Sequence, residues 1–301
     1  MASPTTPTHG KLGALYALRP NGFSGIGLND LTWGVGSTAA DLTKYEVVID
    51  GVGTGAGAVD EFKWRVNGGA WTEHVDITGA AQTLADGQAI TFTATTGHTA
   101  ADQWIIGNLK DEATTVNGST AQITDATARL LNPSAPPTFT PTNAVQLLSV
   151  NYTNGSATFS AAPGVTTVTG NNGFIPTAAL RKAAYLLDWS LNLTLDMADM
   201  TAMGDAWKSA LPGQANGSGS AGAYFVASET LLNCLQESIA AGDKYSLLQL
   251  FNYDPDQDQT GDHINAWATF TSFALGAAIN AVVKETVNFQ VQGEVSFTAN
   301  V

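Results

Sequence analysis

The sequence predicts a mainly β protein with one α-helix, and two stretches of alternating apolar and polar residues carry most of that prediction. They run over residues 189–197 and 287–298. A period of two gives a strand one apolar and one polar face. The pattern changes to a helical period only over 229–241, where Ser228 is placed as the N-cap and Gly242 ends the last turn. We therefore expect strands almost throughout, with a single helix close to the C-terminal third.

Short strands separated by turn residues predict a small all-β module over residues 40–112. The turn Asn67-Gly68-Gly69 is typical of a hairpin because its residues tolerate positive φ. The module is expected to be inserted between an N-terminal arm with a first strand (1–39) and a linker-like segment (113–139), with the main β domain over 140–301. Its candidate strands are 45–50, 61–66, 70–77, 88–93 and 103–107.

Several further elements are expected in the region 140–301. A turn at Asn154-Gly155 predicts a hairpin between strands at 145–153 and 157–160. The tract 213–222 consists almost wholly of Gly, Ser, Asn and Ala, which predicts a loop. Three long strands are expected to close the chain, at 244–253, 264–275 and 283–299.

Composition limits the classes of function. The chain has 301 residues, of which 44% are hydrophobic and only 13% charged, with a formal net charge of −14. A surface so poor in charge is expected where large areas contact other subunits. The acidic balance argues against a nucleic-acid clamp, which needs a basic footprint. Cys234 is the one cysteine, which excludes a disulfide framework and a cysteine zinc site. We expect a reducing cytoplasm during folding, no signal peptide and no membrane-spanning helix.

The polar faces of the two alternating stretches carry no lysine or arginine. Such a face favours a wall along which something anionic passes, and an ordinary solvent-facing strand is the alternative. The candidate wall residues are Ser190, Asn192, Thr194, Asp196, Asn288, Gln290, Gln292 and Glu294.

The order of elements after residue 140 resembles the tail tube (major tail) protein of long-tailed bacteriophages. The resemblance covers about 11–35 and 140–301 and is carried by the hairpin 151–160, strand 189–197 followed by 199–207, the turn Leu211-Pro212-Gly213, the helix 229–241, and the strands 244–253, 264–273 and 287–297. It implies a β-sandwich or barrel subunit with one flanking helix. It also implies self-association, six copies to a ring, with stacked rings forming a hollow tube through which double-stranded DNA leaves.

The resemblance carries further expectations. The partners would be other copies of the chain and other tail proteins, with DNA passing transiently and no insertion into a membrane. The protein would be made in the host cytoplasm and reside in the virion tail. The candidate wall residues would face the lumen, and neither a cofactor nor an enzymatic activity is expected.

An acidic segment is the sharpest local cluster, with carboxylates at Asp254, Asp256, Asp258 and Asp262. Alternating carboxylates supply oxygen ligands to calcium, but Gln259 stands where an EF-hand needs glycine and Asn265 where it needs glutamate. A different cation site stays open as an alternative. The favoured interpretation is an acidic loop between two strands, solvated or facing the lumen.

Two competing functions are weighed against a structural role. An enzyme is disfavoured because His9, His74, His98 and His263 form no metal-binding or triad-like pattern. A carbohydrate- or cell-surface-binding module of a virion is the second alternative, resting on the 40–112 block or on the tryptophans. For those tryptophans, packing in a core or interface is the default expectation. They are Trp33, Trp64, Trp71, Trp104, Trp189, Trp207 and Trp267.

Overall fold

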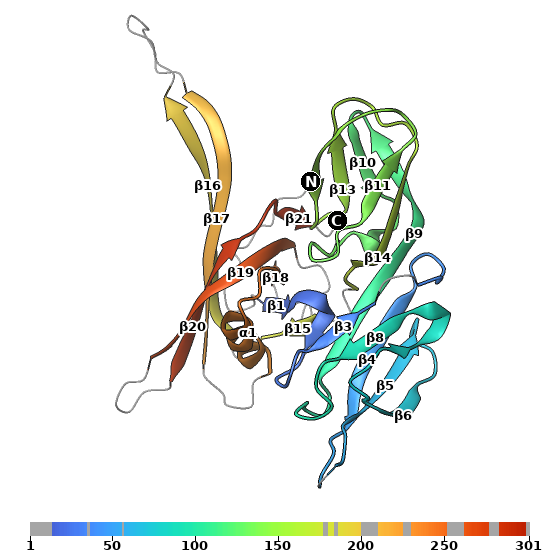
Figure 1. The fold of residues 1–301 in the computed structure, drawn as a ribbon. Helices are drawn as coiled ribbons and strands as arrows, with labels where there is room; N and C mark the ends of the chain where they lie inside the picture. The colour runs from blue at the N-terminus through green and yellow to red at the C-terminus, as the bar shows by residue number, and fades with distance from the viewer. Residues whose placement is uncertain are drawn as a thin grey trace, which may run out of the picture.

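The computed structural model is mainly β, as the sequence predicts, and its described part contains one α-helix. Figure 1 shows two lobes, with one long hairpin projecting away from the left-hand lobe. All strand pairs between the described elements are antiparallel. The structure describes residues 14–34, 37–55, 57–176, 180–183, 186–199, 210–224, 230–251, 262–276 and 283–298.

The left-hand lobe is an eight-stranded sheet, called sheet A here, whose strand order is β15-β1-β18-β19-β20-β17-β16, with β21 paired to β19. Helix α1, Thr230–Ala241, packs on one face of this sheet through Leu235 and Ile239. The strands are β15 (Arg181–Lys182), β1 (Ala14–Leu18), β18 (Ser246–Phe251), β19 (His263–Gly276), β20 (Lys284–Val291), β17 (Ala210–Tyr224), β16 (Leu186–Asp199) and β21 (Ser296–Thr298).

The right-hand lobe holds a ten-stranded sheet in the order β12-β13-β10-β9-β4-β5-β6, with β14, β11 and β2 attached through β9 and β14. A three-stranded sheet, β3-β8-β7, packs beside it. The ten strands are β12 (Leu147–Asn151), β13 (Ser156–Phe159), β10 (Thr120–Ile123), β9 (Gln103–Asn117), β4 (Lys44–Gly51), β5 (Glu61–Val66), β6 (Thr72–Asp76), β14 (Thr166–Phe174), β11 (Thr138–Pro141) and β2 (Phe23–Ser24). The smaller sheet has β3 (Leu31–Trp33), β8 (Ala89–Phe92) and β7 (Gln82–Thr83), and the 3-10 turns are η2 (Pro20–Gly22), η3 (Ala85–Gly87) and η4 (Ala126–Ala128).

A small apolar cluster joins the two lobes. It takes side chains from β1, β18 and β19 of sheet A, from β9, and from the segments before β11 and after β14. Burial of this surface holds the lobes against each other, because apolar area removed from water contributes roughly 25 cal/mol per Å². The buried members are Leu18, Ile105, Leu130, Ile175, Leu247 and Trp267.

The expected hairpin turns are confirmed by backbone geometry. Asn67 and Gly68 have φ of 50° and 70° between β5 and β6, and Gly155 has φ of 67° between β12 and β13. Positive φ at these positions matches the right-handed twist of the flanking strands.

The tract 213–222 is a strand and not the loop that its composition predicts. It lies within β17, which is paired along its length with β16 on one side and with β20 over Ser218–Tyr224 on the other. Ladder hydrogen bonds on both sides compensate for the low strand propensity of Gly and Ser. Tertiary pairing therefore overrides composition at this point.

The terminal strand expected at 283–299 is interrupted. It ends at Val291 and resumes as β21 at Ser296, and Gly293 with φ of 85° lies in the break. A positive φ turns the chain out of the extended conformation, which explains why β21 pairs with a different part of β19.

The expected linker-like segment 113–139 contains the end of β9, all of β10 and the start of β11. The expected module boundary at residue 112 falls inside β9, which runs from the β4 ladder to the β10 ladder. The division of the chain into domains stays a prediction.

Candidate assembly surface

Strands β16 and β20 lie on either side of β17 in sheet A, and their polar residues fall in register across it. Ser190 of β16 is opposite Ser220 of β17, and Ser220 is opposite Asn288 of β20. Asn288 is in turn opposite Ser272 of β19. Directly opposed residues share one face of a sheet. The two alternating stretches of the sequence therefore form one polar surface, called the polar band: Ser190, Asn192, Thr194, Asn216, Ser218, Ser220, Asn288 and Gln290.

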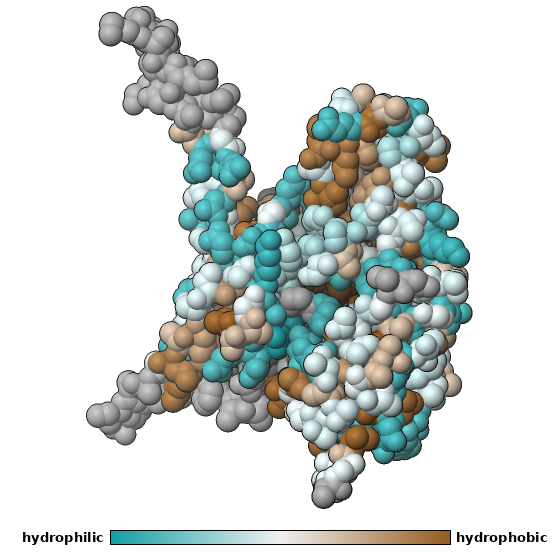
Figure 2. Space-filling view, viewed as in Figure 1, coloured by the Kyte–Doolittle hydropathy of each residue, from teal (hydrophilic) through white to brown (hydrophobic). Residues whose placement is uncertain are grey.

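Side-chain hydrogen bonds tie the polar band together across strands. Ser190 Oγ and Ser220 Oγ are 3.0 Å apart, and Asn288 Nδ2 donates to Ser272 Oγ at 2.8 Å. Gln290 Nε2 donates to Gly217 O at 2.6 Å and also to the amide oxygen of Asn216. The band is thus a bonded layer of hydroxyls and amides, and Figure 2 shows teal side chains along the projecting hairpin β16–β17.

Glycines in β17 allow its neighbours to close over the opposite face. A Cβ on Gly219 would overlap the Phe289 ring and the carbonyl oxygen of Ser190, and a Cβ on Gly217 would lie 2.9 Å from side-chain carbons of Leu193 and Val291. Close approach of a backbone to side chains is a recurrent use of glycine in strands. The high glycine content of 213–222, which predicts a loop, thus allows this close packing in β17.

The apolar face of β16 is covered along only part of its length. Trp189 and Leu191 pack against the core under α1. Farther along the hairpin, Leu193, Leu195 and Met197 are 47%, 52% and 57% exposed. We call these three residues the apolar stripe. A row of exposed large apolar side chains on a protruding hairpin marks a surface for association.

The outer edge of β16 has no partner strand among the described residues. β16 is the last strand of sheet A and is 14 residues long. At the opposite end of the sheet, β15 pairs with β1 through only two positions, Tyr16 and Ala17. Unpaired backbone groups on a long edge are a template for pairing with another chain.

The structure brings together most, but not all, of the predicted wall residues. Ser190, Asn192 and Thr194 of β16 lie in the polar band with Asn288 and Gln290 of β20. Asp196 is exposed on β16 but falls in the register shift between Leu195 and Met197, outside the band. Gln292 and Glu294 lie beyond the end of β20 and so outside the polar band.

Glu294 and Gln292 make other contacts. Asn151 Nδ2 donates to Glu294 Oε2 at 2.8 Å, which ties this segment to the β12–β13 turn, and the backbone N–H of Gln292 donates to Trp267 O at 2.7 Å. A cation also lies on the polar side of β20, since Lys284 is its first residue and alternates with Thr286 and Asn288. That this surface lines a channel stays a prediction.

The acidic loop is only partly described. Asp262 is exposed before β19, and Asp254, Asp256 and Asp258 lie outside the described residues. Among the residues that are described, no group of three or more His, Cys, Asp or Glu side chains is arranged to hold a metal ion.

The described histidines have structural contacts. His98 is fully buried, with Nδ1 2.9 Å from Asp60 Oδ2 and Nε2 3.0 Å from Asp30 Oδ1. Burial alone would raise the pKa of Asp60, but backbone donation by His98 and Gly53 and the contact with the imidazole together hold that pKa below its ordinary value. His74 is exposed beside Glu61, and His9 lies outside the described residues.

Five of the tryptophans pack as the default expectation states, with Trp64 and Trp189 lying against the apolar cores, while Trp71 is in no core cluster and Trp207 lies outside the described residues. Trp33, Trp104 and Trp267 are buried. The ring of Trp71 is approached by the guanidinium of Arg65 at 4.2 Å and by Lys63 Nζ at 5.2 Å. A ring so occupied offers little open face for stacking a sugar.

No helix in the described part of the chain has the length and apolar character needed to cross a membrane.

Comparisons with known proteins give partial likenesses. No protein-family model and no curated protein matches the chain. It is similar to a chain of the tail of an empty gene transfer agent particle with C6 symmetry, at 18% identity, covering 41% of this chain and 89% of that one, with a TM-score of 0.35. It is also similar to a chain of the anti-feeding prophage baseplate, at 12% identity, covering 40% of this chain and 84% of that one, with a TM-score of 0.34.

A further similar structure is the SPP1 tail tube, at 10% identity, covering 55% of this chain and 78% of that one, with a TM-score of 0.35. Because these likenesses are partial and low in identity, the function of the chain has to be argued from its own residues.

Proposed function

We propose that the chain is a structural subunit of a bacteriophage tail tube, which self-associates into rings of six copies that stack into a hollow tube. The observation that carries the proposal is the 14-residue edge of β16 at the end of sheet A, which pairs with no other strand in the part of the chain that the structure describes. Addition of a strand from a neighbouring copy satisfies the backbone groups of such an edge, and closure of strands into a barrel removes edges altogether. Other tail proteins would contact the ends of the tube.

The apolar stripe supports association along the same hairpin. Leu193, Leu195 and Met197 follow one another on the apolar face of β16, beyond the part where Trp189 and Leu191 pack on the core. Their burial by a neighbouring copy contributes at roughly 25 cal/mol per Å² of apolar surface, so the hairpin provides both backbone and side-chain contacts to a partner.

The polar band supports passage of DNA without retention. β16 contains no lysine or arginine, and its three aspartates, Asp188, Asp196 and Asp199, make the strand acidic. The residues of the polar band include no cation to hold phosphates, and Lys284 lies only at the start of β20, so double-stranded DNA would slide along the band. We assign the role of the surface to conduction and not to catalysis.

The assembly is tested with a charged residue in the apolar stripe. Leu195→Asp should leave the subunit folded, because Leu195 is 52% exposed, but should block ring and tube formation by placing a carboxylate in the contact. Val165→Asp is the matched control, since Val165 is 70% exposed in the right-hand lobe. Negative-stain images and light scattering give the readout. Wild-type protein that stays monomeric at every concentration contradicts the proposal.

The channel wall is tested separately with lysines. Ser190→Lys and Asn288→Lys should leave tubes intact and make them retain DNA in a salt-dependent way, because each added cation binds phosphate and releases counterions. Leu191→Lys is the matched control on the buried face and should disrupt folding instead. DNA retention that is the same in wild type and variants would place the polar band outside the lumen.

A further inference from the structure

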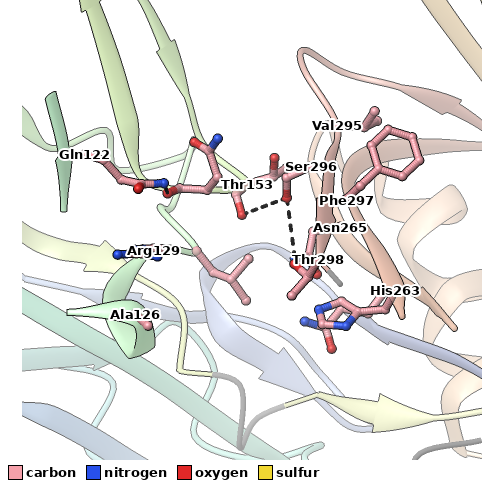
Figure 3. Close-up of a pocket in the computed structure, with 13 residues that line it drawn as sticks. Gln122, Ala126, Arg129, Thr153, His263, Asn265, Val295, Ser296, Phe297 and Thr298 are labelled. Atoms are coloured by element: carbon pink, nitrogen blue, oxygen red, sulfur yellow. Dashed lines mark hydrogen bonds between the residues drawn. The ribbon is translucent and has the colours of Figure 1, made fainter. Parts of the chain in front are cut away.

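An open pocket of about 730 Å³ lies between the two lobes. Figure 3 shows Gln122, Ala126 and Arg129 on one side of it and Ser296, Asn265 and His263 on the other. Pockets of roughly 300–1,000 Å³ at the junction of two structural units are the usual place for a small ligand.

One wall of the pocket is a set of polar side chains in register on three neighbouring strands. Gln249 of β18 pairs with Asn265 of β19, and Asn265 pairs with Ser296 of β21. His263 and Thr298 form the next row. Opposed positions point to the same face, so these strands present amides, hydroxyls and an imidazole to the space.

Asn265 is the buried polar group of this wall that lacks a full set of partners. Its Nδ2 donates to Ser296 Oγ at 3.5 Å, and Ser296 Oγ donates to Thr153 O at 3.2 Å, as the dashed lines in Figure 3 show. Asn265 is 5% exposed, and its Oδ1 has no hydrogen-bond partner among the described residues. An unsatisfied buried acceptor costs about 1–3 kcal/mol. Because the Asn265 amide is held only by the 3.5 Å hydrogen bond to Ser296, the side chain can rotate so that Oδ1 accepts from a ligand donor in the pocket.

The charged side chain that lines the pocket is a cation, opposite in sign to the net charge of the chain, with the Asp125 carboxylate as an electrostatic neighbour outside the lining. The protein has a formal net charge of −14, yet no aspartate or glutamate is among the described residues that line the pocket. Arg129 lines it and is held in place by Nε donation to Ile123 O at 2.8 Å and Nη2 donation to Thr124 O at 3.2 Å. The guanidinium has five N–H donors in a rigid fork, so an oriented arginine still offers donors to an anion.

We propose that this pocket binds an acidic saccharide, with the carboxylate of the sugar on Arg129 and its hydroxyls on the amide and hydroxyl wall around Asn265. A sugar hydroxyl both donates and accepts, which suits a wall of Asn, Gln, Ser and Thr. The anionic group distinguishes an acidic sugar from a neutral one. The inference does not depend on tube formation.

Other ligand classes fit the lining less well. A nucleic acid needs several cations along its backbone, and Arg129 is the one lysine or arginine among the described lining residues. A lipid needs continuous apolar walls, whereas most of the lining side chains are polar. An acidic peptide shares the carboxylate but offers fewer hydroxyl donors, so it serves as the competing probe.

The test is calorimetric titration of the full chain with an oligomer of galacturonic acid. We expect saturable, salt-dependent binding, weaker binding of the matching neutral galactose oligomer, and a loss of about tenfold or more in affinity for Arg129→Gln, because charge-assisted bonds contribute about 1.5–3 kcal/mol. Lys110→Gln removes one exposed cation outside the pocket and should leave the affinity unchanged.

Three outcomes would overturn the inference. No saturable binding of the galacturonic acid oligomer would show that the pocket does not take an acidic saccharide, and equal affinity in wild type and Arg129→Gln would place binding elsewhere. Tighter binding of an acidic peptide such as a short glutamate oligomer would assign the pocket to a protein partner instead. Ring formation, scored by negative stain on the same samples, reports on the proposed function independently of each result.

Discussion

Strand β6 lies at one edge of the ten-stranded sheet and strand β16 at one edge of sheet A, and the two edges differ in length, charge and exposed apolar side chains. β6 ends the ten-stranded sheet and has five residues. Its neighbour β5 holds charges of both signs beside it, with Arg65 bonded to Glu46 at 2.6 Å and Lys63 within 3.7 Å of Asp50. β16 ends sheet A with 14 residues, no cation and the apolar stripe.

The contrast indicates which of the two sheet edges is protected from pairing with another chain. Short length and mixed charge are the means by which proteins keep an edge from pairing with another chain. The β5–β6 edge has both, whereas the β16 edge has neither. The β5–β6 edge is therefore protected within one chain from pairing, whereas the proposed assembly requires a neighbour at the β16 edge.

The largest effect is expected from breaking the core of sheet A. Phe289→Asp places a carboxylate without a partner where the Phe289 ring is 2% exposed, between Phe270 and the glycines of β17. The loss of free energy of unfolding should exceed about 4 kcal/mol, among the largest single-residue effects. Thermal unfolding measures it. Asn288→Asp, one residue away on the exposed polar band, is the control and should change stability by less than about 1 kcal/mol.

A smaller effect is expected from filling the close approach in β17. Gly219→Val adds atoms where even a Cβ meets the Phe289 ring and the Ser190 carbonyl, so it should cost about 1–3 kcal/mol through overpacking. Ser218→Val, on the polar band of the same strand, lacks this overlap and should be nearly neutral. Denaturant unfolding compares them, and equal losses would contradict the idea that glycine in β17 serves packing rather than flexibility.

The sequence predicts which residues of each strand are polar and share a face, but it does not predict which strands lie side by side to form the polar band. Alternation over 189–197 and over 287–291 predicts two faces correctly, because a period of two is a local property of an extended chain. That Ser190 and Asn288 share one surface depends on β17 lying between them, and β17 has a composition that predicts a loop. Ladder pairing with two neighbours is a nonlocal effect, which propensity does not report.

The same limit explains the pocket between the lobes and the displaced residues Gln292 and Glu294. Gln249, Asn265 and Ser296 come from three separate strands, and their register is fixed only by the sheet. The alternating pattern predicts that the strand continues through Gly293. The positive φ of Gly293 instead turns the chain, and β20 ends before Gln292. A glycine inside such a pattern is the signal that could have placed the break.

The right-hand lobe should respond to pH near neutrality. Glu112 is buried beside Asp41, with Oε1 accepting from the backbone N–H of Asp125. Burial first, and then the hydrogen bond with Asp41, raises the pKa of Glu112 to about 7. The folded state thus holds a proton that the unfolded state releases at about its ordinary pKa, so this contribution to stability is present at low pH and is lost as pH rises to about 7.

Glu112→Gln mimics the protonated carboxyl and should flatten the fall in the unfolding midpoint between about pH 5 and about pH 8. Glu237→Gln, which removes an exposed carboxyl from α1, should keep the wild-type profile. Parallel profiles for wild type and Glu112→Gln would show that Glu112 does not titrate in this range.

The smallest change in stability is expected at the β5–β6 edge. The variant there tests whether charge is the feature that distinguishes this edge from the β16 edge. The double variant Lys63→Gln and Arg65→Gln removes two partly exposed ion pairs and the cations over Trp71. Exposed pairs contribute about 0.2–1 kcal/mol each, so the unfolding midpoint should move little. The edge, however, loses the charges that discourage pairing and uncovers an indole ring, so light scattering should report faster association than in wild type. Adding the substitutions to Leu195→Asp separates this new association from that of the β16 hairpin. If scattering does not rise, short length alone protects β6, and charge is not the feature that distinguishes the two edges.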